Sequence, residues 1–379
     1  MFFMQVRLQI SSCFSANLAP ILAPTFQLEG KSMAKFVPSL ILLAVALGSA
    51  STAQAKETYK IAWTIYAGSM PLSYAQDHGI LKKWGEKYGL DIKAVQMNDY
   101  IEAQTQFRLG AFAGSIAMSL DALTIPAAGG MDTTVVMPLS ASNGSDGVVM
   151  RGKNKTLADL KGQRINLVEL SGSHYMLARG LDSAGMSESD ITVVNTSDSD
   201  IGAAFADPST VAVASWKPQL SQILHQFPDT TVVFDSSKIP NELVDVLMVN
   251  TDLLKKEPNL GKALTGAWYE AAAMLNPENP KHGEFIKYSA AILGTDPDSV
   301  EDQFSTIKFF TPVTAKEYVV SQDFKSKISE MAAFSFKHGL FESASEPGYV
   351  GIEAGDGTII GSARNIKLRF PTTWIEEPK

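Results

Sequence analysis

Short apolar runs alternate with amphipathic stretches from Lys60 to Val249. Runs rich in β-branched residues and bounded by turn-forming residues predict strands. These runs are Ile61–Ile65, Asp91–Gln96, Ser115–Ala117, Thr134–Pro138, Arg164–Leu170, Thr192–Asn195, Val211–Ser215, Thr231–Phe234 and Val246–Val249. The stretches between them predict helices, among them Leu72–Tyr88, Tyr100–Leu109, His174–Ala184 and Pro218–His225. This alternation predicts an α/β fold whose sheets are mixed and mainly parallel, with helices on their faces.

The first strand, the loop after it and the following helix form the most informative segment, Lys60–Asp77. Tyr66 and Gly68 lie in the loop, and Pro71 opens the helix, where its missing N–H costs nothing. The start of a helix leaves backbone N–H groups without partners, so a corner of this kind is suited to contact a ligand.

Two breaks in the pattern predict a division into two lobes. The polar, glycine-containing stretch Ser142–Gly147 separates two strands, and Pro240 and Asn241 interrupt the pattern again within Ile239–Asp245. We therefore predict lobe one from residues 56–142 and 241–379 and lobe two from residues 143–240. Beyond Asn250 the chain is mostly helical, with Leu260, Leu264, Trp268 and Leu275 on one apolar face, and Tyr349–Trp374 is expected to consist of strands and turns.

The N-terminal region carries an export signal. Residues 33–55 combine a basic start, an apolar run and the small-residue ending Ala53–Ala55, which predicts a signal peptide and a mature chain that begins at Lys56. Residues 1–32 are interpreted as an N-terminal extension that is not part of the fold. The location expected from this signal is the periplasm.

Composition narrows the possible partners. Three of the 32 basic and one of the 40 acidic residues precede Lys56, so the mature chain keeps 29 basic and 39 acidic residues and a net charge of −10. This acidity argues against binding to nucleic acid or an anionic membrane. The single cysteine, Cys13, lies before the mature chain, which excludes disulfides and cysteine chemistry in it.

In open α/β sheets, ligands bind beyond the carboxyl ends of the strands. This rule selects side chains that would face one cleft, namely Trp63, Tyr66, Asp121, Glu169, Ser171, Ser173, Trp216 and Asp245. Several have structural alternatives: Trp63 could belong to the core, and Asp121, Ser171 and Ser173 could cap helices. Glu169 could pair with Arg164 or Lys217. Asp146 could serve only to form a turn.

Aromatic rings combined with carboxylates suit a small planar cation. A guanidinium stays charged and matches a carboxylate bidentately, and its face can stack on Trp or Tyr. Urea would need an additional donor facing its carbonyl oxygen. A sulfonate or nitrate would favour N–H groups and a cation, and Lys217 leaves that alternative open.

Several segments carry a resemblance to a known family: Trp63–Pro71, Ser119–Ala122, Leu157–Gly162, Ser173–Leu177, Phe205–Pro218 and Gly351–Phe370. On these residues the chain resembles periplasmic solute-binding proteins of ABC importers, in the group that serves nitrate, sulfonates, taurine and thiamine precursors. Residues 123–130, 168–171 and 195–198 resemble the branch encoded beside urea carboxylase, now associated with guanidine. The resemblance implies a two-lobed periplasmic-binding-protein fold with a hinge, a ligand such as guanidinium or urea, and an ABC permease of the inner membrane as partner.

Catalytic motifs are missing from the sequence. The five histidines show no HExxH spacing, and neither GxSxG nor a phosphate-binding loop is present. Pyrimidine-precursor synthases share the implied fold but carry a cysteine-rich motif that this chain lacks. We therefore expect a monomeric binding protein without catalytic residues, metal or cofactor. The alternatives are a binding protein for a sulfonate, taurine or a thiamine precursor and, third, a synthase-like enzyme.

Overall fold

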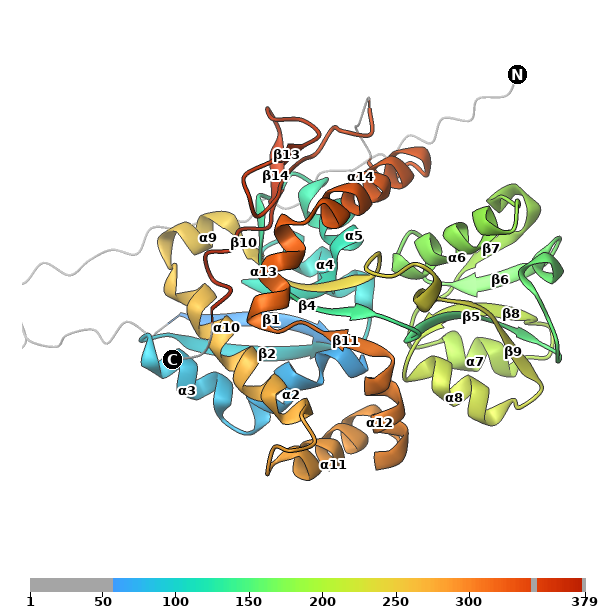
Figure 1. Cartoon of the computed structure of the whole chain (residues 1–379), viewed down its shortest axis with the longest axis horizontal. Coiled ribbons are helices and arrows are strands. Elements are labelled where there is room, and N and C mark those ends of the chain that lie inside the picture. The colour runs from blue at the N-terminus through green and yellow to red at the C-terminus, as the bar shows by residue number, and fades with distance from the viewer. Residues whose placement is uncertain (1–56, 342–345, 377–379) are drawn as a thin grey trace, which may run out of the picture. The chain divides into compact units, whose positions relative to one another are not determined.

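The computed structural model describes residues 57–341 and 346–376. The predicted signal peptide (33–55), the extension (1–32) and Cys13 lie outside the described residues. The described chain forms two sheets with helices on their faces (Figure 1).

The larger sheet has nine strands in the order β13-β12-β14-β4-β10-β3-β1-β2, with β11 paired to β4. Its strands are β1 (Thr58–Thr64), β2 (Asp91–Met97), β3 (Gly114–Met118), β4 (Thr133–Ser142), β10 (Val244–Asn250), β11 (Ile307–Phe309), β12 (Gly351–Glu353), β13 (Ile359–Ile360) and β14 (Ile366–Arg369). Parallel pairs join β1 to β2 and to β3, whereas β10 runs antiparallel between β3 and β4.

The smaller sheet has five strands in the order β7-β6-β8-β5-β9. They are β5 (Asp146–Arg151), β6 (Arg164–Leu167), β7 (Thr192–Asn195), β8 (Ala212–Trp216) and β9 (Thr230–Asp235). β6 is parallel to β7 and β8, while β5 is antiparallel to β8 and β9. All five strands fall inside residues 143–240, the range that the sequence assigns to lobe two.

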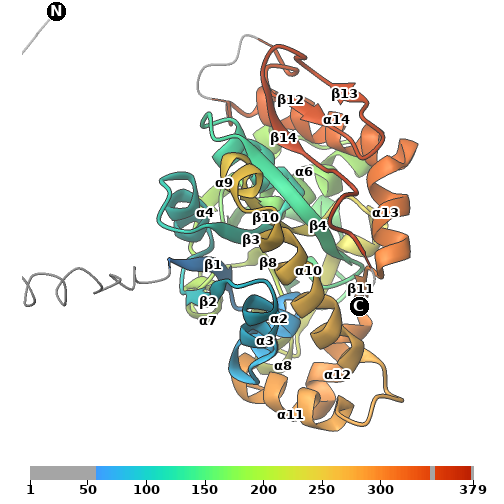
Figure 2. The same ribbon diagram turned by 90° about the vertical axis from the view of Figure 1, so that its left-hand side faces the viewer.

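The helices cover these sheets. They are α2 (Met70–Asp77), α3 (Ile80–Lys87), α4 (Tyr100–Arg108), α5 (Ser119–Ala122), α6 (Gly172–Ser183), α7 (Ile201–Ala206), α8 (Gln219–Gln226), α9 (Thr251–Lys256), α10 (Asn259–Ala272), α11 (His282–Leu293), α12 (Pro297–Ser305), α13 (Pro312–Val320) and α14 (Gln322–Lys337). α10 packs against α2 and α3 through its apolar face, on which Leu260, Leu264 and Trp268 are buried (Figure 2). The mostly helical character predicted after Asn250 is confirmed.

Two predicted boundaries were wrong. The single helix expected at Leu72–Tyr88 is two helices, because His78 and Gly79 interrupt it and Gly79 adopts φ +75°. Glycine tolerates this left-handed conformation, which ends one helix and redirects the next. The strand expected at Arg164–Leu170 ends at Leu167, and Leu170 has φ +64° in the turn that follows.

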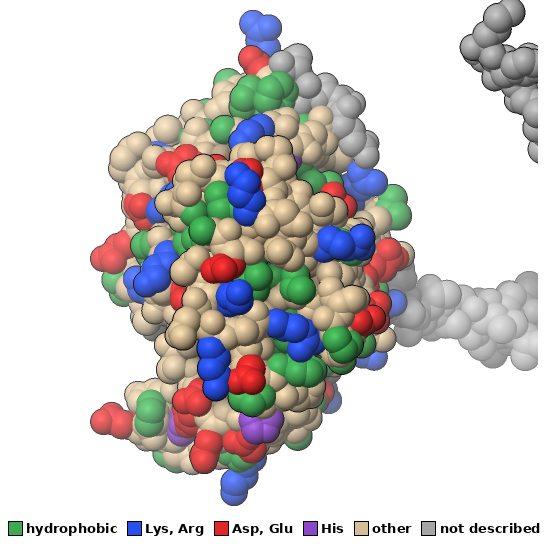
Figure 3. All heavy atoms as spheres, turned by 90° about the vertical axis from the view of Figure 1, so that its right-hand side faces the viewer, with side chains coloured by type: hydrophobic (Ala, Val, Ile, Leu, Met, Phe, Trp, Pro, Cys, Tyr) green, Lys and Arg blue, Asp and Glu red, His purple; other side chains and the backbone are tan. Residues whose placement is uncertain are grey.

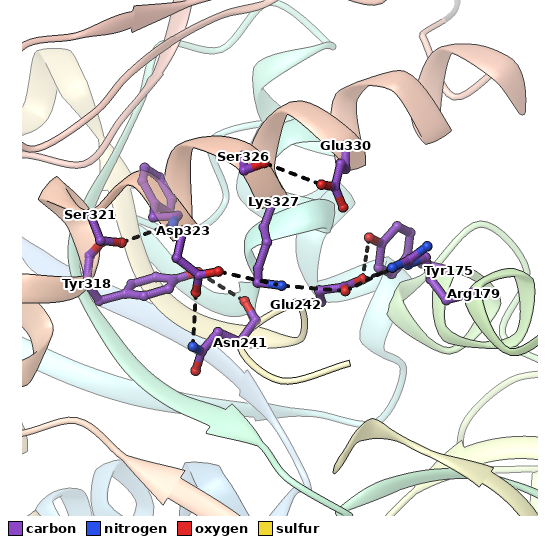
Figure 4. Close-up of polar contacts among 11 residues, drawn as sticks. Tyr175, Arg179, Asn241, Glu242, Tyr318, Ser321, Asp323, Ser326, Lys327 and Glu330 are labelled. Atoms are coloured by element: carbon purple, nitrogen blue, oxygen red, sulfur yellow. Dashed lines mark hydrogen bonds and ion pairs between the residues drawn. The ribbon is translucent and has the colours of Figure 1, made fainter. Parts of the chain in front are cut away.

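The chain passes between the two sheets twice. The first crossing is short, since only residues 143–145 separate β4 from β5. The second joins β9 to β10 and includes Glu242, which is 4% exposed. Glu242 accepts hydrogen bonds from Tyr175 and Arg179 of α6, at 2.7 and 2.9 Å, and lies 3.6 Å from Lys327 of α14 (Figure 4). The ion pairs of buried Glu242 thus connect the second crossing to α6, which follows the smaller sheet's β6, and to α14 near the C-terminal end of the chain.

On the side of the molecule where the smaller sheet and its helices lie, Lys, Arg, Asp and Glu side chains are interspersed (Figure 3). Below that surface, Val149 and Val213 of the sheet pack with Phe205, Leu220 and Ile223 of α7 and α8. Among the described residues, no helix is long and apolar enough to cross a membrane.

Candidate ligand-binding site

A cavity of about 30 Å³ lies where strands of both sheets end. Its wall includes residues from the larger sheet and its helices, namely Thr64, Tyr66, Ser69, Tyr100, Ile116, Ala117, Met118, Asp121 and Asp245. The smaller sheet and α6 supply Ser171, Gly172, Ser173 and Trp216. One water needs roughly 10–15 Å³ of such space. The cavity therefore suits a ligand of only a few non-hydrogen atoms.

Asp121 is a fully buried acidic group of the wall. It lies in α5, directly after β3, and its side chain is 0% exposed. Its Oδ2 accepts a hydrogen bond from the Tyr100 hydroxyl at 2.6 Å, while Oδ1 makes no hydrogen bond of ordinary geometry. Burial raises the pKa of Asp121 to about 7, against smaller lowering effects of Tyr100 and the backbone N–H of Gly172. A buried carboxylate with an unused oxygen is costly unless a ligand pairs with it.

Asp245 supplies a second carboxyl group from β10. Its Oδ2 accepts a hydrogen bond from Ser140 at 2.9 Å, and the β10–β4 register shifts beside it. Burial raises its pKa to about 8, and the neighbouring charges of Asp146 and Asp121 contribute to this shift. Asp146, in turn, is fully buried at the start of β5, and neither of its carboxylate oxygens has a hydrogen bond of ordinary geometry.

Three aromatic rings complete the wall. Tyr66 is buried in the loop after β1, and its hydroxyl interacts with the side chain of Ser145 but makes no hydrogen bond of ordinary geometry. Trp216, the last residue of β8, meets Tyr100 edge-on with ring centroids 5.7 Å apart. Trp63 of β1, by contrast, does not line the cavity and packs in the hydrophobic core. A core position was the alternative to ligand contact that the sequence left open for it.

The two serines before and within α6 have different environments. Ser171 is the N-cap of α6: its Oγ accepts from the N–H of Ser173 at 3.2 Å and donates to the carbonyl of Val168 at 2.7 Å. The Oγ of Ser173 is buried and has no partner among the described residues. The hydroxyl of Ser173 is therefore available to a ligand. The hydroxyl of Ser171 already makes two hydrogen bonds as the N-cap.

Glu169 is not brought to this cavity. Its side chain is exposed and lines a separate cavity of about 310 Å³ together with Arg108 and Leu170. Its backbone N–H donates to Asn195 Oδ1 at 3.0 Å. Because β6 ends at Leu167, the turn around Leu170 directs Glu169 away from the three aspartates.

Positive charge is missing from the wall. None of the described residues that line the cavity is Lys, Arg or His. Lys217 follows Trp216, but its Nζ donates to Thr306 Oγ1 at 3.2 Å, away from the site. Within the described residues, no three His, Cys, Asp or Glu side chains are arranged to hold a metal ion.

Sequence reasoning missed Tyr100. It opens α4 after β2, so the strand-end rule that selects Asp121 also applies to it. The sequence places Asp146 near the first crossing, where it could face the cleft or only form a turn. In the structure it begins a buried strand whose register places it opposite Trp216.

Residues 68–282 match the family model described as NMT1/THI5 like. A binding protein of Brucella abortus is 25% identical over 288 residues, which are 74% of this chain and 86% of that protein.

Two solved structures show the same fold. The alkanesulfonate-binding protein of Xanthomonas axonopodis pv. citri, bound to MOPS, gives a TM-score of 0.66 at 17% identity, over 83% of this chain and 99% of that chain. The periplasmic aliphatic sulphonate binding protein of Escherichia coli gives a TM-score of 0.62 at 19% identity. This match covers 76% of this chain and 95% of that chain. The fold is therefore the two-lobed α/β fold of periplasmic binding proteins, as predicted.

Proposed function

The chain belongs to the NMT1/THI5-like family, and we propose that it is the solute-binding protein of an ABC importer for a small cationic nitrogen compound of the guanidinium type. The single observation that carries the choice of ligand is the buried Oδ1 of Asp121, which makes no hydrogen bond of ordinary geometry, in a cavity whose described wall has aromatic rings and no basic side chain. A cation would supply the missing hydrogen bond and the missing charge together.

The same geometry disfavours an anion. A sulfonate or nitrate would need N–H donors or a cation, and the start of α6 is the helix end that could offer them. There, however, the N–H of Gly172 faces the Asp121 carboxyl and lowers its pKa. An anionic ligand would therefore have to enter beside a carboxyl group rather than beside a free donor.

Urea has the size and shape of guanidinium but no charge. It could occupy the cavity only if its carbonyl oxygen met a donor, such as the hydroxyl of Tyr66 or Ser173. It would not offset the charge of a carboxylate, so guanidinium is favoured by the charge-assisted part of the hydrogen-bond energy.

Ligand capture would use both lobes. Asp121 and Tyr100 come from the lobe of the larger sheet, while Trp216 and Ser173 come from the other lobe. A ligand that contacts both favours the closed arrangement by its differential affinity, and the two crossings absorb the rotation. We further propose that the closed protein delivers its ligand to an inner-membrane permease from the periplasm, acting as a monomer.

Calorimetric titration of the purified protein with guanidinium chloride, urea, taurine and nitrate tests this function. We expect saturable binding of guanidinium, with an affinity at least about 100-fold above that for taurine. Tighter binding of taurine or nitrate than of guanidinium would overturn the proposal. Turnover of guanidinium, detected as released ammonia, would show an enzyme instead.

A further inference from the structure

Asp146 lies behind the wall of the cavity and is not needed to form it. It is the first residue of β5, 0% exposed, and pairs in register with Trp216, which does line the cavity. Its carboxyl group is close enough to Asp245 and Tyr66 to influence the pKa of both. Both of its oxygens are buried without a hydrogen bond of ordinary geometry.

No basic side chain of residues 57–341 and 346–376 is among the groups that shift the pKa of Asp146 or Asp245. Facing Asp146 and Asp245 are Tyr66 after β1, Tyr100 of α4 and Asp121 of α5. Asp198, from the loop before α7, contacts the backbone N–H of Tyr100 and adds a further acidic group. Arg151, in the same strand as Asp146, donates instead to the backbone carbonyl of Thr210 at 2.9 Å. Lys217, which follows Trp216, interacts with Thr306, Asp302 and Asp235.

Neighbouring carboxyl groups in one dry site cannot all be ionised, because each charge opposes the next and burial opposes them all. Burial raises the pKa of Asp146 to about 7. The pKa of Asp245 is raised to about 8 by burial and by the charge of Asp146. Such groups titrate as one coupled unit rather than independently.

We propose that the buried carboxyl groups of Asp146 and Asp245 together retain one proton in the empty protein and that the ligand cation takes the place of this proton on binding. One cation enters and one proton leaves to solvent, so the charge of the site is unchanged. Asp146 is then a positioning residue that determines specificity through Asp245 without touching the ligand. The inference rests on the proposed function for the identity of the cation. A neutral molecule such as urea releases no proton, so only a cation gains affinity as the pH rises.

The binding experiment is calorimetry with guanidinium chloride at pH 6, 7 and 8, in buffers of different ionisation enthalpy. Wild-type protein should release about one proton per ligand near pH 7, and its Kd should fall by up to about tenfold per pH unit. Asp146→Asn should release less than half as much and show a flatter pH profile, with its Kd at pH 8 within about threefold of wild type. Asp298→Asn, an exposed residue of α12, is the matched control and should behave as wild type.

A second experiment needs no ligand. The two carboxyl groups bind protons more tightly in the folded protein than in the unfolded chain, where the pKa of Asp is about 4. Their contribution to stability is therefore complete below pH 4 and is lost as the pH rises through about 7 to 8. Urea denaturation at pH 5.5, 7 and 8.5 measures the free energy of unfolding. Between pH 5.5 and 8.5 this free energy should fall less in Asp146→Asn than in wild type or Asp298→Asn.

The outcomes separate the inference from the function on which it rests. Failure of guanidinium to bind would count against the ligand, while the denaturation experiment would still decide whether the proton is retained. Absence of proton release by wild-type protein that does bind guanidinium would overturn the inference, and that measurement stands even if Asp146→Asn does not fold. Full proton release or an unchanged stability profile in Asp146→Asn would also overturn it.

Discussion

Gly172, the first residue of α6, lies so close to Met118 at the end of β3 that a β-carbon on the glycine would clash with the methionine sulfur. Both residues line the cavity: Met118 ends a strand of the larger sheet, whereas Gly172 begins the helix that follows β6 of the smaller sheet. The absence of a side chain at Gly172 therefore allows the two predicted lobes to approach each other at the ligand.

Gly172→Ala should weaken guanidinium binding by up to about tenfold in the closed state, because the added β-carbon displaces the Met118 sulfur, although the flexible Met side chain can absorb part of the overpacking. Alanine favours a helix over glycine, so the stability of the empty protein should not fall. Titration calorimetry and thermal denaturation check the two effects. The matched control is Gly202→Ala in α7, where a β-carbon meets nothing within 4 Å. Equal affinities of the two variants would show that the contact does not exist in the bound protein.

Asp121→Asn tests the carboxylate that faces the cavity. The variant keeps the shape of the side chain and a hydrogen-bond acceptor for Tyr100, but it loses the charge. Hydrogen bonds to charged groups contribute about 1.5–3 kcal/mol, so guanidinium should bind about 10- to 150-fold more weakly. Calorimetry at pH 8, where wild-type Asp121 is mainly ionised, measures the effect. Retention of wild-type affinity would remove Asp121 from the site.

Glu169→Gln should leave guanidinium affinity within about twofold of wild type, since substitutions of exposed residues away from a site have small effects. The sequence alone leads to the opposite expectation, loss of binding. The structure changes it because Glu169 is exposed and lines a separate cavity with Arg108 and Leu170. Calorimetry compares the guanidinium affinities of Glu169→Gln and Asp121→Asn. If Glu169→Gln loses as much affinity as Asp121→Asn, Glu169 contacts the ligand.

The case of Glu169 shows what periodicity can predict and what it cannot. The apolar run Arg164–Leu170 predicted a strand in the right place, and β6 starts at Arg164 as expected. The end of a strand, however, depends on where its partners end, and β7 pairs with β6 only as far as Leu167. Glu169 therefore lies in the turn after the strand and lines a different cavity from Asp121 and Asp245.

Asp146 shows the reverse error. A polar, glycine-rich segment predicted a linker at Ser142–Gly147, and the chain does cross between the sheets there. Yet β4 extends to Ser142 and β5 begins at Asp146. Asp146, a residue type that is common in turns, therefore lies buried in a sheet. Composition predicts the polarity of a segment but not which members pair with a neighbouring strand, since pairing is a tertiary property.

Glu242→Gln tests the ion-pair cluster at the second crossing. The variant keeps the size of the side chain but removes the charge that pairs with Arg179 and Lys327 (Figure 4). The cations left behind are partly exposed, with Arg179 at 37% and Lys327 at 16%, so the loss is smaller than for a fully buried pair. The free energy of unfolding at pH 7 should fall by about 1.5–3 kcal/mol. Urea denaturation measures it. The control is Asp229→Asn, which breaks an exposed pair with Lys153 and should cost less than about 1 kcal/mol.

The pH dependence of that loss follows from the ionisation of Glu242. Burial opposes its charge, but hydrogen bonds from Arg179 and Tyr175 and the charge of Lys327 outweigh burial and lower its pKa. A lowered pKa gives stability that is present above the unfolded value of about 4.3 and is lost as the pH falls through the folded value. The difference between wild type and Glu242→Gln should therefore shrink below about pH 4. A difference that stays constant down to pH 3 would mean that packing, not charge, makes Glu242 stabilising.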